Sequence, residues 1–253
     1  MQIEYLWNEK APFQIDFRPF MECNPIPGAK SAIIVCPGGG YEFKSTEHEG
    51  REFCRFFNDA GYSAYQLDYR VFPCHREAPL QDALRAIRMV RAKGYEKVGI
   101  MGFSAGGNLA CCAAVHFDGG NPDADDPVDR FSSRPDALIS CYSVVSFQEY
   151  THAGSVKALL ADVAENEELQ KRFSAQKNVK DDSPHAFIWH TAEDAAVPVE
   201  NSLMLAGAYS AKKIPFEMHI FPNGGHGLGM AQGVPGTETW PELMLDWLKR
   251  EAF

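Results

Sequence analysis

Short apolar runs rich in β-branched residues alternate with helical patterns along most of this chain. A continuous apolar run is typical of a strand that is buried on both faces, as strands are in a parallel sheet. Helices between such strands provide the crossover connections that parallel pairing requires. The alternation therefore predicts an α/β fold with a mostly parallel, doubly wound sheet and helices on both faces. The runs lie at Ala32–Cys36, Ser63–Leu67, Val98–Phe103, Ala137–Cys141, Ala186–His190 and Phe216–Phe221.

Local signals place helices between these runs and edge strands before them. Thr46–Glu49 has the pattern of a capping box, and Thr239–Glu242 repeats the pattern before the last helix. Pro79 is favourable at the start of a helix. Ile3–Trp7 and Phe13–Phe20 are short, of mixed polarity and interrupted by proline, which suits antiparallel edge strands. The expected helices cover about 46–61, about 79–94, the residues after Ser104, about 200–211 and the residues after 239.

The length of 253 residues fits one large α/β domain, and we expect a single domain over residues 1–253. The alternation is interrupted between about 143 and 184, where no convincing strand occurs and only weak helical pieces are found. Long connections of this kind are often functional lids. We therefore predict a small cap insert at about 143–184.

Composition excludes several classes of partner. The formal net charge of −10 disfavours binding to nucleic acid and to anionic membrane surfaces. The first residues show no basic segment followed by an apolar run, so we expect no secretory signal, and no run is long enough to span a membrane. Seven cysteines without a CxxC pair favour free thiols and a cytoplasmic location. Hydrophobic edge strands are compatible with a homodimer.

Gly102–Gly106, GFSAG, is a G-x-S-x-G motif that follows the apolar strand KVGIMGF and opens a segment of small residues. Such a strand-to-helix elbow exposes the serine hydroxyl at the end of the strand. It also directs the amide of Ala105 at the position of a developing oxyanion. The motif makes Ser104 the candidate nucleophile. The alternative is a tight glycine-rich turn with an incidental serine.

A second glycine-rich segment, Pro37–Tyr41, comes directly after the buried run AIIVC. This is the position of the oxyanion loop in folds of this kind, where the sequence is often HGGG, and here proline replaces the histidine. The amides of Gly39 and Gly40 are candidate oxyanion donors together with that of Ala105. A glycine-rich loop could instead bind phosphate. That alternative is weaker because no Lys-Ser/Thr pair follows and no G-x-G-x-x-G pattern occurs.

The candidate base is His226, which lies among glycines after the last predicted strand. The candidate acid is Asp194, which follows the strand AFIWH and precedes a turn into a helix. Glu193 is its neighbouring rival, and His190 is either a buried, satisfied imidazole or a contact of the acid. An ionised carboxylate would orient the imidazole and stabilise it when it is protonated. The order Ser, Asp, His is that of α/β hydrolases.

Together, the PGGGY loop, MGFSAGGNLA, HTAEDAAVPVENS, NGGHGLG and the terminal WPELMLDWLKR resemble bacterial carbohydrate acetyl esterases. These are the acetylxylan-esterase-like and xylanase B-like members of the α/β-hydrolase superfamily. The resemblance runs from about residue 30 to the end of the chain and is weakest over 117–185. It implies an α/β-hydrolase fold, a triad of Ser104, Asp194 and His226, and oxyanion donors at Gly39, Gly40 and Ala105. It also implies hydrolysis of small acyl esters, such as acetyl groups on sugars, without a metal or organic cofactor.

On this interpretation the chain is a serine carboxylesterase that forms an acyl-serine intermediate on a small-molecule ester. Tyr41 and Phe103 are expected either to border the pocket or simply to pack in the core. Two alternatives remain open. One is an oligopeptidase-like serine hydrolase, which shares the elbow and the order of the triad. The other is a small-molecule-binding protein with a hydrolase fold and no catalysis, although binding alone needs no base.

Overall fold

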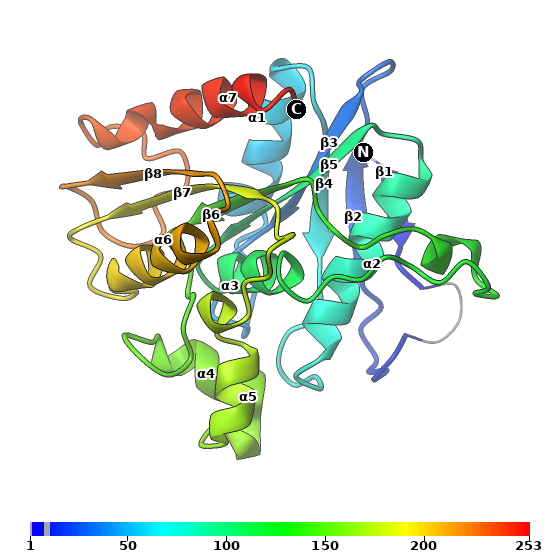
Figure 1. The fold of residues 1–253 in the computed structure, drawn as a ribbon, viewed down its shortest axis with the longest axis horizontal. Helices are drawn as coiled ribbons and strands as arrows, with labels where there is room; N and C mark the ends of the chain where they lie inside the picture. The colour runs from blue at the N-terminus through cyan, green and yellow to red at the C-terminus, as the bar shows by residue number, and fades with distance from the viewer. Residues whose placement is uncertain (1, 8–10) are drawn as a thin grey trace.

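The computed structural model describes residues 2–7 and 11–253. In this part of the chain the strands form one eight-stranded sheet in the order β1-β2-β4-β3-β5-β6-β7-β8 (Figure 1). The pairs β1/β2 and β2/β4 are antiparallel, and the remaining neighbours are parallel. The strands are β1 Gln2–Tyr5, β2 Phe20–Asn24, β3 Ser31–Cys36, β4 Ser63–Asp68, β5 Lys97–Phe103, β6 Ala137–Cys141, β7 His185–Thr191 and β8 Phe216–Phe221.

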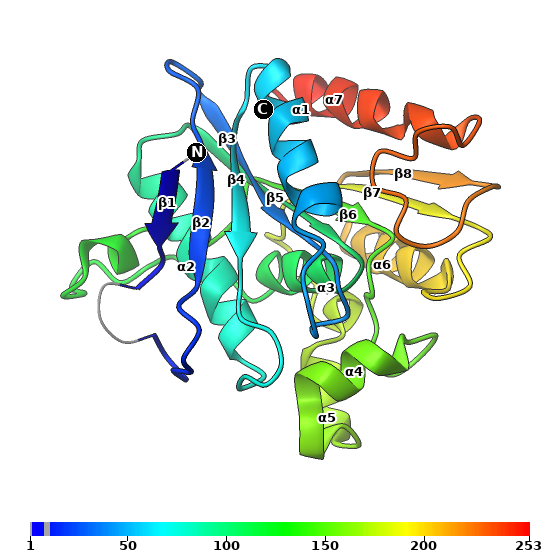
Figure 2. The same cartoon turned by 180° about the vertical axis from the view of Figure 1, so that it is seen from behind.

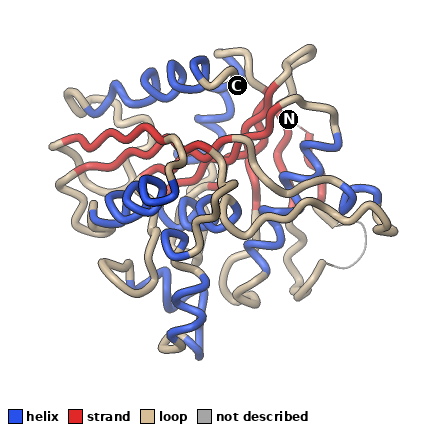
Figure 3. The backbone as a smooth tube through the Cα atoms, viewed as in Figure 1, coloured by secondary structure: helices blue, strands red, loops and turns tan. Residues whose placement is uncertain are grey.

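Helices cover both faces of this sheet. Figures 1 and 2 show α1 and α7 on one face and α2, α3 and α6 on the other, and Figure 3 shows the strands between these two layers. Each face has its own cluster of buried apolar side chains. The mostly parallel, doubly wound sheet predicted from the sequence is therefore confirmed. The helices are α1 Glu52–Asp59, α2 Ala78–Ala92, α3 Ser104–Ala113, α4 Ala153–Leu160, α5 Glu167–Arg172, α6 Glu200–Lys212 and α7 Trp240–Arg250.

The order of the strands reverses between β3 and β5. From β3 the chain crosses to β4 on one side and returns to β5 on the other. In the register of β3 and β5, Cys36 is paired with Gly102. The loop after β3 and the residue after β5 therefore leave the sheet side by side. Ligands of open α/β sheets bind at the carboxyl ends of the strands at such a switch point.

The predicted edge strand over Phe13–Phe20 is wrong, because β2 begins only at Phe20. Phe13 has a φ of +55°, which is incompatible with a strand. The guanidinium of Arg70 donates hydrogen bonds to the carbonyl oxygens of Pro12 and Phe13. These carbonyls accept hydrogen bonds from a side chain instead of from a neighbouring strand.

Both predicted capping boxes are also wrong, although helices follow them. Thr46 makes no side-chain cap, and a π-helical turn, Glu47–Arg51, comes before α1. Glu49, whose side chain should have bonded back to the helix start, instead accepts a hydrogen bond from the amide of Gly38. At the second site, the hydroxyl of Thr239 donates to the carbonyl oxygen of Gly236. At the first site a hydrogen bond to a residue outside the helix replaces the capping box. At the second site a hydrogen bond to a carbonyl three residues earlier replaces it.

The segment between β6 and β7 contains α4 and α5, with two short 3₁₀ turns at Ala161–Val163 and Ala175–Lys177. Figure 1 shows α4 and α5 projecting beyond α3, away from the sheet. Their function as a cap stays a prediction. All seven cysteines are free thiols, and all except Cys74 are buried. Among the described residues, no helix combines the length and the apolar character needed to cross a membrane.

Candidate active site

Ser104 lies at the elbow between β5 and α3. Its φ is +53°, whereas the preceding Phe103 is extended. A non-glycine residue in this region of φ costs free energy and is typical of functional sites. A Cβ atom on Gly106 would lie 2.3 Å from the carbonyl oxygens of both Cys36 and Pro37. Glycine at this position therefore lets α3 begin directly against the end of β3.

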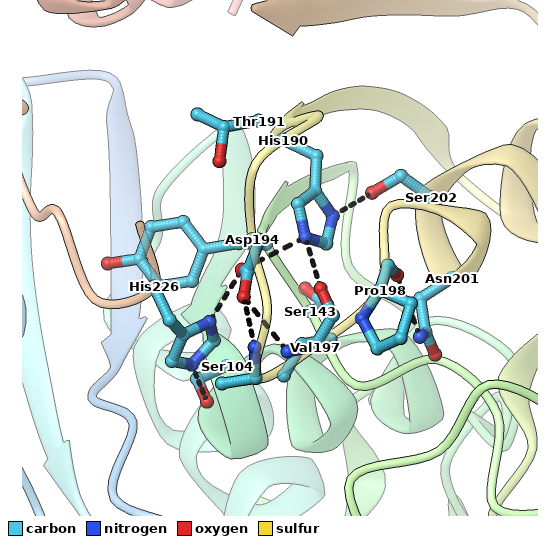
Figure 4. Close-up of polar contacts among 12 residues, drawn as sticks. Ser104, Ser143, His190, Thr191, Asp194, Val197, Pro198, Asn201, Ser202 and His226 are labelled. Atoms are coloured by element: carbon cyan, nitrogen blue, oxygen red, sulfur yellow. Dashed lines mark hydrogen bonds and ion pairs between the residues drawn. The ribbon is translucent and has the colours of Figure 1, made fainter. Parts of the chain in front are cut away.

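The three side chains predicted as a triad lie in one chain of hydrogen bonds (Figure 4). His226 Nε2 is 2.7 Å from Ser104 Oγ, and His226 Nδ1 is 2.7 Å from Asp194 Oδ2. Because an ionised carboxylate only accepts hydrogen bonds, Nδ1 carries the proton and Nε2 accepts the hydrogen bond from the serine hydroxyl. In this tautomer the imidazole is ready to take the serine proton.

Asp194 is buried and has several further donors. Its Oδ1 accepts hydrogen bonds from the amides of Ala196 at 3.0 Å and Val197 at 2.9 Å, and His190 Nε2 lies 3.2 Å from its Oδ2. Burial by itself would raise the pKa of this carboxyl. The hydrogen bonds from His190, His226 and Val197 outweigh burial and hold the pKa well below its ordinary range. Asp194 is therefore ionised throughout the neutral range.

His190 is both a buried imidazole and a contact of the acid. Its Nε2 lies 2.9 Å from the carbonyl oxygen of Val197, and its Nδ1 lies 2.9 Å from Ser202 Oγ (Figure 4). The carbonyl can only accept, so Nε2 is the protonated nitrogen and also faces Asp194. The rival acid Glu193 is exposed, and its carboxylate accepts a hydrogen bond from the amide of Gly224.

The candidate oxyanion donors gather around Ser104. Gly39 and Gly40 line the same cavity as Ser104 and His226, with φ values of +134° and +66°. Ala105 is in the first turn of α3, where amides have no partner within the helix. A Cβ atom on Gly39 would lie 2.3 Å from the carbonyl oxygen of Phe43, so the tight loop requires glycine there. The role of these three amides as oxyanion donors stays a prediction.

Sequence reasoning missed a buried pair beside the cavity, Glu49 and Tyr142. Glu49 Oε2 accepts a hydrogen bond from the amide of Gly38 at 2.9 Å, and Glu49 Oε1 accepts one from the hydroxyl of Tyr142 at 2.6 Å. The same hydroxyl accepts a hydrogen bond from the amide of Gly229 at 3.0 Å. Burial, followed by the charge of Glu49, raises the pKa of Tyr142 well above its ordinary value, so the hydroxyl remains a donor. The Tyr142 ring also packs edge-on against His226, with 5.1 Å between centroids.

The cavity above Ser104 has a volume of about 320 Å³. Its walls include Phe43 beside the glycine-rich loop and His152, which precedes α4. Tyr41 and Phe103 are not among the residues that line it, so the prediction that they border the pocket is wrong. Both are buried in the core, where their side chains point away from the cavity: the hydroxyl of Tyr41 donates to Asn108, and the ring of Phe103 packs 4.6 Å from that of Phe53.

The three hydrogen-bonded residues follow one another along the chain as Ser104, Asp194 and His226, and they lie on a mostly parallel sheet. This order and this sheet are those of the α/β hydrolases, and we assign the chain to this class. The chain belongs, within this class, to the BD-FAE family, whose model matches residues 25–209.

Individual relatives are similar over most of this chain. Endo-1,4-beta-xylanase B of Butyrivibrio fibrisolvens is 43% identical over 216 residues, which cover 80% of this chain and 33% of the xylanase. Acetylxylan esterase of Xylanibacter ruminicola is 29% identical over 228 residues, which cover 86% of this chain and 45% of the esterase. The chain thus spans less than half of the length of these two relatives. A crystal structure of an acetyl ester-xyloside bifunctional hydrolase from Caldicellulosiruptor lactoaceticus has a TM-score of 0.96 and 40% identity, covering 100% of this chain and 97% of that one.

Proposed function

We propose that this protein is a serine esterase that removes short acyl groups, acetyl above all, from carbohydrate esters. One observation carries the proposal: the unbroken chain of hydrogen bonds from Ser104 through His226 to Asp194 at the end of β5. The hydroxyl of Ser104 opens into a cavity large enough for a small ester. The seven free thiols also support a reducing compartment, and we propose the cytoplasm.

In the proposed reaction, His226 Nε2 takes the proton of Ser104 while Oγ attacks the ester carbonyl. The amides of Gly39, Gly40 and Ala105 stabilise the tetrahedral oxyanion, each by about 3 kcal/mol. The protonated His226 then gives its proton to the leaving alcohol, and the acyl group remains on Ser104. Water, activated in turn by His226, hydrolyses this acyl-enzyme and releases the acid. Asp194 stays ionised and stabilises the imidazolium in both steps.

The carbohydrate part of the proposal is supported by the names of similar proteins, which include an acetylxylan esterase and an acetyl ester-xyloside hydrolase. The cavity adds independent support because polar side chains such as those of Ser45, His48 and His152 line it. Hydroxyl-rich substrates need such partners. An oligopeptidase-like activity and a binding role without catalysis are less well supported. Neither explains both the hydrogen-bonded triad and the polar lining of the cavity.

The test is a series of initial rates on p-nitrophenyl acetate, butyrate and octanoate, with Ser104→Ala as the control. We expect rates to fall steeply as the acyl chain lengthens, and we expect turnover to be lost in Ser104→Ala. Activity on aminoacyl-naphthylamides but on none of the esters would instead indicate an oligopeptidase. A Ser104→Ala variant that hydrolyses acetate at the wild-type rate would refute the assigned nucleophile.

A further inference from the structure

His152 lies in the wall of the active-site cavity and also caps a helix. It precedes α4, in the segment between β6 and β7. Its Nδ1 accepts a hydrogen bond from the amide of Ser155 at 3.2 Å, which satisfies one of the free amides at the start of α4. The hydroxyl of Ser155 lies 2.8 Å from the same nitrogen. The ring is therefore held in place by its Nδ1 side.

This cap determines which nitrogen carries the proton. A backbone amide can only donate, so Nδ1 of His152 must be unprotonated and Nε2 must carry the hydrogen. Burial, followed by the charge of His226, lowers the pKa of His152, which keeps the ring neutral at pH 7. Within residues 2–7 and 11–253, Nε2 of His152 has no hydrogen-bond partner. A fixed donor without a protein partner thus lies in the wall of the cavity.

The neighbourhood of His226 indicates which part of an ester this donor would meet. The leaving oxygen must lie against His226 Nε2, because it takes its proton from that atom. His152 and His226 line the same cavity, together with Ser104. A substrate group that lies beside both imidazoles then belongs to the leaving alcohol. In a sugar ester, the nearest polar group of that alcohol is the hydroxyl on the adjacent carbon.

We propose that His152 is a specificity-determining residue whose Nε2–H binds the hydroxyl next to the esterified oxygen, so that the enzyme prefers esters of vicinal diols. This inference rests on the proposed esterase function and extends it to the alcohol side of the substrate. His152 is half-buried, and a substrate that covers its Nε2–H without offering an acceptor leaves this donor unpaired, whereas a substrate hydroxyl satisfies it.

The experiment uses two acetates of nearly equal shape, 2-hydroxyethyl acetate and n-propyl acetate, which differ in one hydroxyl against one methyl group. The preference is the kcat/KM for 2-hydroxyethyl acetate divided by the kcat/KM for n-propyl acetate. This ratio is divided by the same ratio of the alkaline hydrolysis rates, which corrects for the intrinsic reactivity of the two esters. The variant His152→Asn retains an acceptor for the Ser155 amide, because asparagine is a good helix cap, and removes the donor at Nε2. The variant His152→Gln retains a donor, since the glutamine amide nitrogen is as many bonds from Cα as imidazole Nε2. It removes the acceptor for the Ser155 amide.

We expect the preference for the hydroxyethyl ester to fall about fivefold in His152→Asn, the worth of one hydrogen bond. The preference should be largely kept in His152→Gln. Phe43→Ala, which removes an apolar part of the same cavity wall but not the donor of His152, should not lower the preference for the hydroxyethyl ester. A wild-type enzyme without the preference, or a His152→Asn variant that keeps it, would overturn the inference. If wild type hydrolysed neither ester in a Ser104-dependent way, the proposed function itself would fail.

Discussion

The hydroxyl of Tyr142 donates a 2.6 Å hydrogen bond to the buried carboxylate of Glu49, across 93 residues of sequence. Glu49 holds the glycine-rich loop through the amide of Gly38, and Tyr142 holds the histidine loop through the amide of Gly229. The two loops that flank Ser104 are therefore joined through the hydrogen bond between Glu49 and Tyr142. His48 Nε2 also lies 3.0 Å from the carbonyl oxygen of Gly227, and both residues line the cavity.

Tyr142→Phe should weaken both the fold and the reaction. The change removes both hydrogen bonds of the hydroxyl and leaves the Glu49 carboxylate one donor short. We expect the free energy of unfolding to fall by about 1–3 kcal/mol. We also expect kcat to fall about tenfold with little change in KM, because His226 loses a support of its position. Urea unfolding and steady-state rates measure these effects. Tyr5→Phe, on the exposed edge strand β1, is the matched control, and a Tyr142→Phe variant as stable as the control would contradict the prediction.

Asp194 should contribute to stability in a pH-dependent way. Its pKa is lowered in the folded protein, because hydrogen bonds outweigh the effect of burial. The ionised carboxylate therefore stabilises the fold above its ordinary pKa of 3.8, and this contribution is lost as the pH falls below that value toward the folded pKa. The difference in free energy of unfolding between wild type and Asp194→Asn should be constant near neutral pH and shrink in acid. Urea unfolding between about pH 7 and pH 3 tests this, and a difference that does not vary with pH would refute it.

The backbone of Ser104 should carry a measurable cost. At its φ of +53° a Cβ atom is unfavourable, and glycine is not. Ser104→Gly should therefore be more stable than Ser104→Ala by about 1 kcal/mol, although both variants lose the nucleophile. Thermal or urea unfolding of the two variants side by side measures the difference. Equal stability of the two would mean that the elbow is not strained.

Close approach of α3 to the end of β3 predicts opposite effects of the same substitution at two glycines. Gly106→Ala places a methyl group 2.3 Å from two carbonyl oxygens and should destabilise the protein by about 1–3 kcal/mol or more. Gly207→Ala is the matched control in α6, where a Cβ atom meets nothing within 4 Å. It should stabilise the protein by up to about 1 kcal/mol, because alanine favours a helix. Similar effects at both positions would argue against the close approach.

The sheet could be predicted well from the sequence because the signals for its strands lie in short, local segments. The strands follow short apolar or β-branched runs, and the bounds of β6 and β8 agree with the prediction residue by residue. Ser104, Asp194 and His226 each follow a strand, and the fold places such residues at one edge of the sheet. The alternation of strands and helices was therefore enough to predict that these three side chains meet.

Long-range contacts explain what the sequence did not predict. The capping-box rule assigned Glu49 a local partner, whereas its real partners are Gly38 and Tyr142. Tyr41 and Phe103 adjoin the functional motifs along the chain, but their side chains point into the core. His152 lies in a segment without periodicity, and its position in the cavity follows only from how α4 packs. None of these contacts has a signature in a short window of sequence.

The hydrogen bond between His226 and Ser104 joins residues 122 positions apart, and β6, β7 and β8 form between them along the chain. A chain that has folded only as far as β5 and α3 already has its serine on the elbow, but it has no base beside it. Contacts between such distant residues are made slowly, after the local helices have formed. In a refolding experiment, esterase activity would therefore return later than the helical circular dichroism signal. The delay would report when the last strand is added to the sheet.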